Sequence, residues 1–162
     1  MSRKVLIAGV GNIFLGDDAF GVEVAQRLMR LSLPEGVSVR EFGIRGFDLA
    51  YAMMEVWDLV ILADATQRGG RPGTIYVIDA GDDSLRSSGE LQPHGMTPMQ
   101  AIDLVKVLGG TPPPMLVIGC EPADLGGEDG FMGLSPAVER AVTEAVAIIE
   151  EKAEKFVAAA AA

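Results

Sequence analysis

Thiol, imidazole and positively charged side chains are all scarce in this chain of 162 residues. It has one cysteine, Cys120, and one histidine, His94. A single cysteine excludes an internal disulfide framework and a zinc site built from several thiolates, and it fits a reducing cytoplasm. Thirteen Lys and Arg face 23 Asp and Glu, so the net charge is −10. This is the wrong sign for neutralising phosphates, so we expect neither nucleic acid nor an anionic membrane surface as a partner.

Long hydrophobic runs are also lacking. The apolar run near the N-terminus reaches Gly9, Gly11 and a pair of aspartates after about six residues, too short for a signal peptide or a membrane span. Composition does not shift sharply along the chain, and no internal repeat is present. We therefore expect one domain over residues 1–157, followed by an alanine tail of uncertain origin, Ala158 to Ala162.

Apolar runs and helix-type patterns alternate along the chain, which predicts a three-layer α/β/α sandwich with a mostly parallel central sheet. Thr97, Pro98 and Gln100 form the sequence of a capping box, which marks a helix start. In such sheets ligands collect beyond the carboxyl ends of the strands. The expected strands are residues 4–10, 37–42, 57–63, 74–78 and 115–119, and the expected helices are one after the 9–18 turn, 47–54, 97–108 and one from Ser135.

Several acids and the single histidine are expected near that carboxyl edge. Asp17 and Asp18 follow the first strand; one of them is explained as a helix N-cap, and the other is either a surface acid or a ligand. Asp64 ends the most hydrophobic strand, where it either bonds the next turn or points into the crevice above the sheet. His94 ends a polar loop. Asp18, Asp64 and His94 together make a plausible O/O/N set for a divalent first-row metal.

Two other kinds of site stay open. A nucleotide-binding protein would use Gly9, Gly11 and Glu41, but Phe14 stands where the dinucleotide fingerprint needs a small residue. A thiol protease or transferase would use Cys120 with His94 as its base.

The ordered motifs GVGNIFLGDDAFG, ILADA, PHG, GCEP and GLSP resemble those of the nickel-iron hydrogenase maturation endopeptidases, over roughly residues 4 to 150. The resemblance implies an α/β endopeptidase that removes a C-terminal peptide from the precursor of the hydrogenase large subunit after nickel insertion. It carries the metal-contacting and catalytic roles onto Asp18, Asp64 and His94, supported by the loop residues Gly9, Gly11, Asn12 and Asp17.

The chemistry that the resemblance implies is hydrolysis of one peptide bond, with nickel supplied by the substrate as the recognition element. In isolation the site would be empty or would hold another divalent cation. Asp17 or Asp18 could instead be the general base, as in an aspartic-type peptidase. A metal-binding chaperone that does not cleave would need the same three ligands.

Several further expectations concern the surroundings of this site. The loops 79–92 and 121–133 are expected to be mobile, to frame the site and to clasp the partner. The segment 126–132 is long and glycine-rich, and Arg45 lies within the loop 43–48; both bear on substrate choice. A cytoplasmic monomer is expected.

Overall fold

The structure is a computed structural model that describes residues 3–80 and 97–159. Each predicted element is present with bounds shifted by a few residues at most. The strands are β1 (Val5–Val10), β2 (Val37–Gly43), β3 (Leu59–Ala65), β4 (Ile75–Asp79) and β5 (Met115–Cys120). A 3₁₀ turn, η1 (Gly16–Ala19), precedes the helices α1 (Phe20–Met29), α2 (Gly46–Met53), α3 (Pro98–Val107) and α4 (Pro136–Ala159).

The five strands form one sheet in the order β2-β1-β3-β5-β4. The first four in that order are parallel, whereas β4 runs antiparallel to β5. A short turn joins β3 to β4, and it leaves no room for the helical crossover that a parallel strand needs. The predicted mostly parallel sheet is confirmed.

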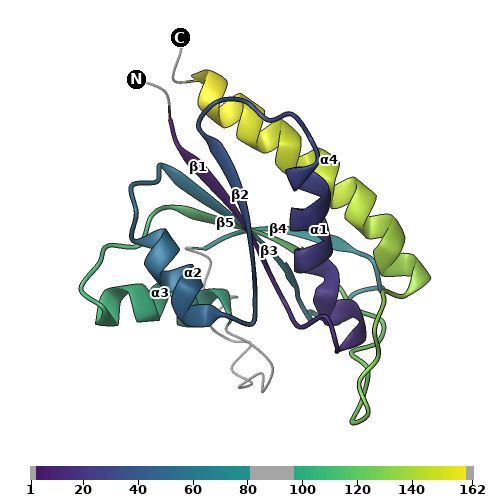
Figure 1. The fold of residues 1–162 in the computed structure, drawn as a ribbon. Helices are drawn as coiled ribbons and strands as arrows, with labels where there is room; N and C mark the ends of the chain where they lie inside the picture. Colours follow the sequence, from purple (N-terminus) through teal and green to yellow (C-terminus); the bar gives the residue numbers. More distant parts are fainter. Residues whose placement is uncertain (1–2, 81–96, 160–162) are drawn as a thin grey trace.

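Two helices cover each face of the sheet, so the fold has the predicted three layers (Figure 1). Helices α1 and α4 close one hydrophobic core around Ile7, Ile61 and Ile118. Helices α2 and α3 close the other around Leu6 and Leu62. Because β1 and the middle of β3 are buried on both faces, their sequences read as continuous apolar runs with no alternation.

The helix ends follow the sequence signals in part. The Thr97 side chain accepts a hydrogen bond from the Gln100 amide, and the Gln100 side chain accepts one from the Thr97 amide, so the capping box is formed. Helix α4 continues through Ala158 to Ala159, and therefore takes in the start of the alanine run.

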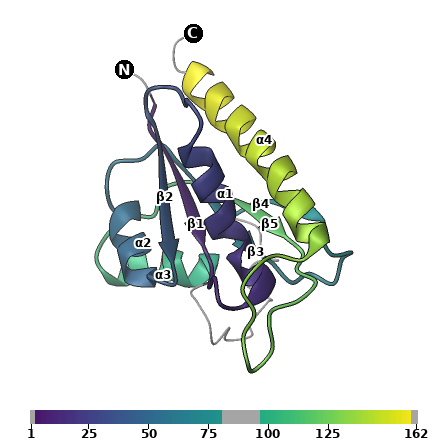
Figure 2. The same cartoon turned by 45° about the vertical axis from the view of Figure 1, so that its right-hand side comes forward.

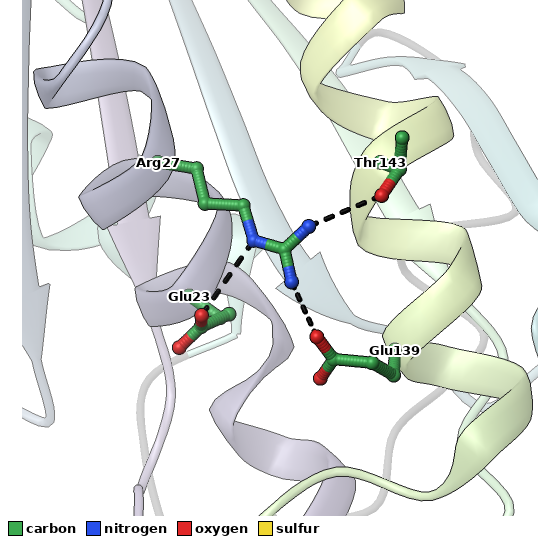
Figure 3. A network of polar contacts seen from close by, with 4 residues as sticks. All are labelled: Glu23, Arg27, Glu139 and Thr143. Carbon is green, nitrogen blue, oxygen red and sulfur yellow. Dashed lines mark hydrogen bonds and ion pairs between the residues drawn. The ribbon is translucent and has the colours of Figure 1, made fainter.

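A polar network joins the outer surfaces of α1 and α4 (Figure 3). The Arg27 guanidinium pairs with Glu23 and Glu139 and donates a 3.1 Å hydrogen bond to the Thr143 hydroxyl. Such exposed pairs contribute at most about 1 kcal/mol each. The two helices are therefore held mainly by the apolar side chains beneath, such as Leu28 and Ile149, which are fully buried.

Within the described residues, no helix has the length and apolar character needed to cross a bilayer.

Candidate functional site

The turn after β1 presents the first candidate carboxylate, Asp18. The backbone amide of Asn12 donates a 2.8 Å hydrogen bond to Oδ2 of Asp18. Gly11 has a φ of +143°, and a Cβ there would lie 1.8 Å from the Asp18 carbonyl oxygen. Only glycine permits this approach, so the Gly11–Asn12 peptide fixes the position of Asp18.

Asp64 lies near the end of β3, opposite Gly119 of β5, and its side chain is partly buried. Burial raises the pKa of Asp64 well above its usual range, and the negative charge of Asp18 raises it further, against a hydrogen bond from the Ala65 amide that lowers it. The turn η1, which carries Asp18, packs against β3, so both acids belong to the same edge of the sheet.

The environment of Asp18 and Asp64 is compatible with a bound cation, because the two carboxylates repel each other and Asp64 is partly desolvated. A divalent ion near both oxygens would remove the repulsion and would replace the lost hydration of Asp64. Oxygen ligands of this kind, joined by an imidazole, suit a first-row divalent metal. The donor chemistry of the two acids therefore agrees with the predicted metal contact.

The third predicted ligand, His94, lies outside the described residues, as does most of the loop 79–92. Within residues 3–80 and 97–159 no three metal-ligating side chains converge on one point. The complete set of Asp18, Asp64 and His94 therefore stays a prediction. The structure places η1, which carries Asp18, against β3, which carries Asp64.

Asp17, the neighbour of Asp18, is fully buried. Its carboxylate accepts hydrogen bonds from the amides of Ala123, Asp124 and Ser135, at 2.7–3.0 Å, and from the Ser135 hydroxyl. Helix α1 has no side-chain N-cap, so the N-cap explanation for one of the two acids is wrong. With both oxygens occupied, Asp17 is a structural anchor and is poorly placed to act as a general base.

The loop that Asp17 anchors, residues 121–135, lies beside the turn after β1 (Figure 2). Leu15 and Phe131 form an isolated parallel bridge, in which Phe131 donates to the Phe14 carbonyl and Gly16 donates to the Phe131 carbonyl. The loop therefore lies against the turn that carries Asp18, as the expected framing of the site requires. Its expected mobility stays a prediction.

A second buried acid, Glu121, was not expected from the sequence. Its Oε1 accepts hydrogen bonds from the amides of Arg68 and Gly70 and from the Tyr76 hydroxyl, all at 2.8–2.9 Å. Burial raises the pKa of Glu121, but these hydrogen bonds outweigh it and lower the pKa below the ordinary value. Glu121 thus holds the turn that follows Asp64. Its place directly after the apolar strand β5 was the only signal of this role.

The thiol alternative is not supported by the environment of Cys120. Its side chain is fully buried, and burial together with the charges of Asp17, Glu121 and Glu144 raises its pKa to about 12. A thiol in this state is a poor nucleophile at neutral pH.

The nucleotide-binding alternative is not supported either, because packing within the fold explains the glycines on which it rests. A Cβ at Gly9 would lie 2.2 Å from the Gly21 carbonyl oxygen, so Gly9 serves the close packing of β1 on α1. Phe14 is exposed in the turn, and the close approach of helix to strand occurs at Gly21, whose Cβ would collide with the Val10 and Ala63 carbonyls.

Comparison with known proteins agrees with this geometry. The profile of the hydrogenase maturation protease family matches residues 22–152. The chain is 29% identical to the hydrogenase 2 maturation protease of Escherichia coli over 158 residues, which cover 96% of this chain and 90% of the relative.

Two solved structures are similar as well. The hydrogenase maturating endopeptidase HybD of E. coli superposes with a TM-score of 0.75 at 28% identity, covering 91% of this chain and 90% of that one. The maturation protease HycI of Thermococcus kodakarensis gives a TM-score of 0.72 at 28% identity, covering 93% and 92%. The α/β fold with a mostly parallel sheet and the family resemblance are both confirmed: the chain belongs to the hydrogenase maturation protease family.

Proposed function

We propose that this protein is an endopeptidase that removes a C-terminal peptide from the nickel-loaded precursor of a [NiFe] hydrogenase large subunit. The observation that carries the proposal is the match to the hydrogenase maturation protease family over residues 22–152. The negative charge of Asp18 raises the pKa of Asp64, a repulsion that a cation would relieve. The nickel is cargo of the substrate, held by the substrate's own cysteines. The protease acts in the cytoplasm as a monomer.

In this proposal Asp18, Asp64 and His94 contact the substrate's nickel and use it to recognise a correctly loaded precursor. The nickel supplies Lewis acidity when it is docked. The Asn12 amide keeps the Asp18 carboxylate in place, so the binding geometry exists before the substrate arrives. In the alternative in which a carboxylate of this pair is the general base, Asp18 is the candidate, since both oxygens of Asp17 accept hydrogen bonds from the loop 121–135.

The test is the intact mass of a precursor incubated with this protein, with and without prior nickel loading. The proposal expects loss of a C-terminal peptide only from the loaded form. Cleavage of both forms would overturn the proposal that the enzyme recognises its substrate through the bound nickel. Cleavage of neither, with loading verified, would favour a metal-binding chaperone that does not cleave.

The histidine provides the residue test. His94→Ala should abolish cleavage, because it removes a proposed contact to the substrate's nickel. The melting temperature should stay close to that of the wild type, because the substitution changes no residue of the two hydrophobic cores. Asp103→Ala on the exposed side of α3 is the matched control and should retain activity. Full cleavage by His94→Ala would refute the proposed ligand set.

A further inference from the structure

A groove with a volume of about 330 Å³ opens beside the turn after β1, on the β2 side of the sheet. It lies between that turn, helix α1 and the turn that joins β2 to α2. None of its walls comes from Asp18 or Asp64. The lining residues that matter below are Asn12, Ile13, Phe14, Glu41, Ile44 and Arg45.

The rim of the groove is unusually apolar for an exposed surface. Phe14 is 58% exposed, Ile44 is 61% exposed and Ile13 is 40% exposed, and the buried Phe42 closes the floor. None of these three side chains belongs to either hydrophobic core. Apolar side chains that gather at a concave surface mark a site of protein interaction.

One carboxylate interrupts this apolar surface. Glu41 lies in the groove, where its Oε1 is 3.1 Å from the position that a Cβ would take at Gly43. In the described part of the chain its carboxylate has no hydrogen-bond or ion-pair partner. An acid beside apolar walls is partly deprived of solvent, so an incoming cation would be bound more strongly there than on open surface.

The arginine that lines the groove does not pair with the Glu41 carboxylate. Arg45 lines the same groove, yet its guanidinium donates to the backbone carbonyls of Glu41, at 2.6 Å, and of Phe42, at 3.1 Å. Its third contact is the Asp48 carboxylate, at 3.5 Å. Arg45 therefore fixes the turn and leaves the Glu41 carboxylate available.

We propose that this groove binds a segment of the protein substrate in which a lysine or arginine adjoins an apolar side chain. The apolar side chain contacts Phe14 and Ile44, and the cation pairs with Glu41. This inference rests on the proposed function, because it names the part of the enzyme that selects the substrate. The groove joins the candidate site through Asn12, whose amide holds Asp18, so a segment seated in it leads toward the carboxylate pair.

The kinetic test compares charge reversal inside and outside the groove. With nickel-loaded precursor as substrate, Glu41→Lys should raise KM at least about tenfold and leave kcat within about twofold, and Glu41→Gln should give a smaller rise in the same direction. Glu154→Lys, an equal charge change on the exposed side of α4, is the control and should match the wild type. Equal effects of Glu41→Lys and Glu154→Lys would overturn the proposal, as would a loss confined to kcat.

A second pair of variants tests the apolar contact with the groove. Ile44→Ser should also raise KM, whereas Val107→Ser, at an 81% exposed position of α3 remote from the groove, should not. Equal KM values for these two variants would overturn the apolar contact.

A binding measurement separates the groove from the proposed reaction, because it needs neither nickel nor cleavage. The probe is the capped peptide acetyl-Leu-Lys-Phe-amide, titrated into the ¹⁵N-labelled protein, with acetyl-Leu-Glu-Phe-amide as its control. Shifts of the Gly11, Gly43 and Ile44 amides with the lysine peptide alone, reduced in Glu41→Gln, would support the groove even if no precursor were cleaved. Absence of these shifts, or equal shifts with both peptides, would overturn it even if the precursor were cleaved.

Discussion

Asp17 and Asp18 are sequence neighbours that the fold uses for different tasks. Asp17 is buried among four donors from the loop 121–135. Asp18 instead accepts a hydrogen bond from the Asn12 amide, and its charge raises the pKa of Asp64. The 3₁₀ turn η1 makes this division possible, because successive side chains of a tight helical turn point in different directions. One acid thus stabilises the surroundings in which the other binds.

Asp17→Asn tests this anchor. The amide nitrogen cannot accept a hydrogen bond, so at least one buried donor loses its partner, and we expect a loss of about 2–4 kcal/mol in the free energy of unfolding. Urea denaturation measures it. Asp124→Asn, at an exposed neighbouring position, is the control. An unchanged midpoint would show that Asp17 is not the anchor.

Asp64→Asn should have the opposite effect on stability. Removal of the charge ends the repulsion from Asp18 and the cost of burying a carboxylate, so the variant should gain on the order of 1 kcal/mol and lose cleavage. Thermal melting and the precursor mass assay are the two measurements. A lower melting temperature would mean that the Asp64 carboxylate stabilises the fold.

Residue types and order predicted the candidate acids, but not how each is used. Asp18 and Asp64 were grouped because both lie near the carboxyl ends of parallel strands, and the structure packs η1, which carries Asp18, against β3, which carries Asp64. One of the two neighbouring aspartates was explained as a helix cap because a sequence shows only local partners, whereas the partners of Asp17 lie more than 100 residues away. The same separation concealed the contact of Glu121 with the 68–70 turn.

At the scale of elements, Glu121 joins the end of β5 to the turn between β3 and β4. Its pKa is lower in the folded protein than the value of 4.5 for the free group. The folded state therefore binds this proton more weakly than the unfolded chain does. The resulting stability is present above about pH 4.5 and is lost as the pH falls through the folded pKa.

Glu121→Gln should accordingly destabilise the protein at pH 7, and the difference from wild type should shrink below about pH 4.5. Denaturation of both proteins across pH 3–7 measures this difference. Glu128→Gln, an exposed acid of the neighbouring loop, serves as the control and should show no such pH dependence. A difference that stays constant with pH would assign the effect of Glu121→Gln to packing.

The elements themselves were predictable because their signals are local. Continuous apolar runs mark β1 and β3, and the capping box marks α3. The direction of β4 was not predictable from its own residues. It is set by pairing with β5, which comes about 40 residues later in the chain.

The whole molecule carries a net charge of −10, and the loop 121–133 adds acids beside the candidate site. A field of this kind attracts a positively charged surface over distances near the Debye length, about 8 Å at physiological ionic strength. The cation proposed to pair with Glu41 would belong to such a surface. Charge would then bring the partner to the correct side before short-range contacts form.

We therefore expect the association rate with nickel-loaded precursor to fall by about tenfold or more between low and high salt, with dissociation changing much less. Stopped-flow binding gives both rates. The double variant Glu128→Gln with Asp129→Asn, in the loop beside the site, should flatten the salt dependence. The double variant Glu144→Gln with Glu154→Gln, on α4, removes the same charge and should flatten it less. Equal flattening by both would mean that only total charge matters, and a salt-independent rate would exclude electrostatic steering.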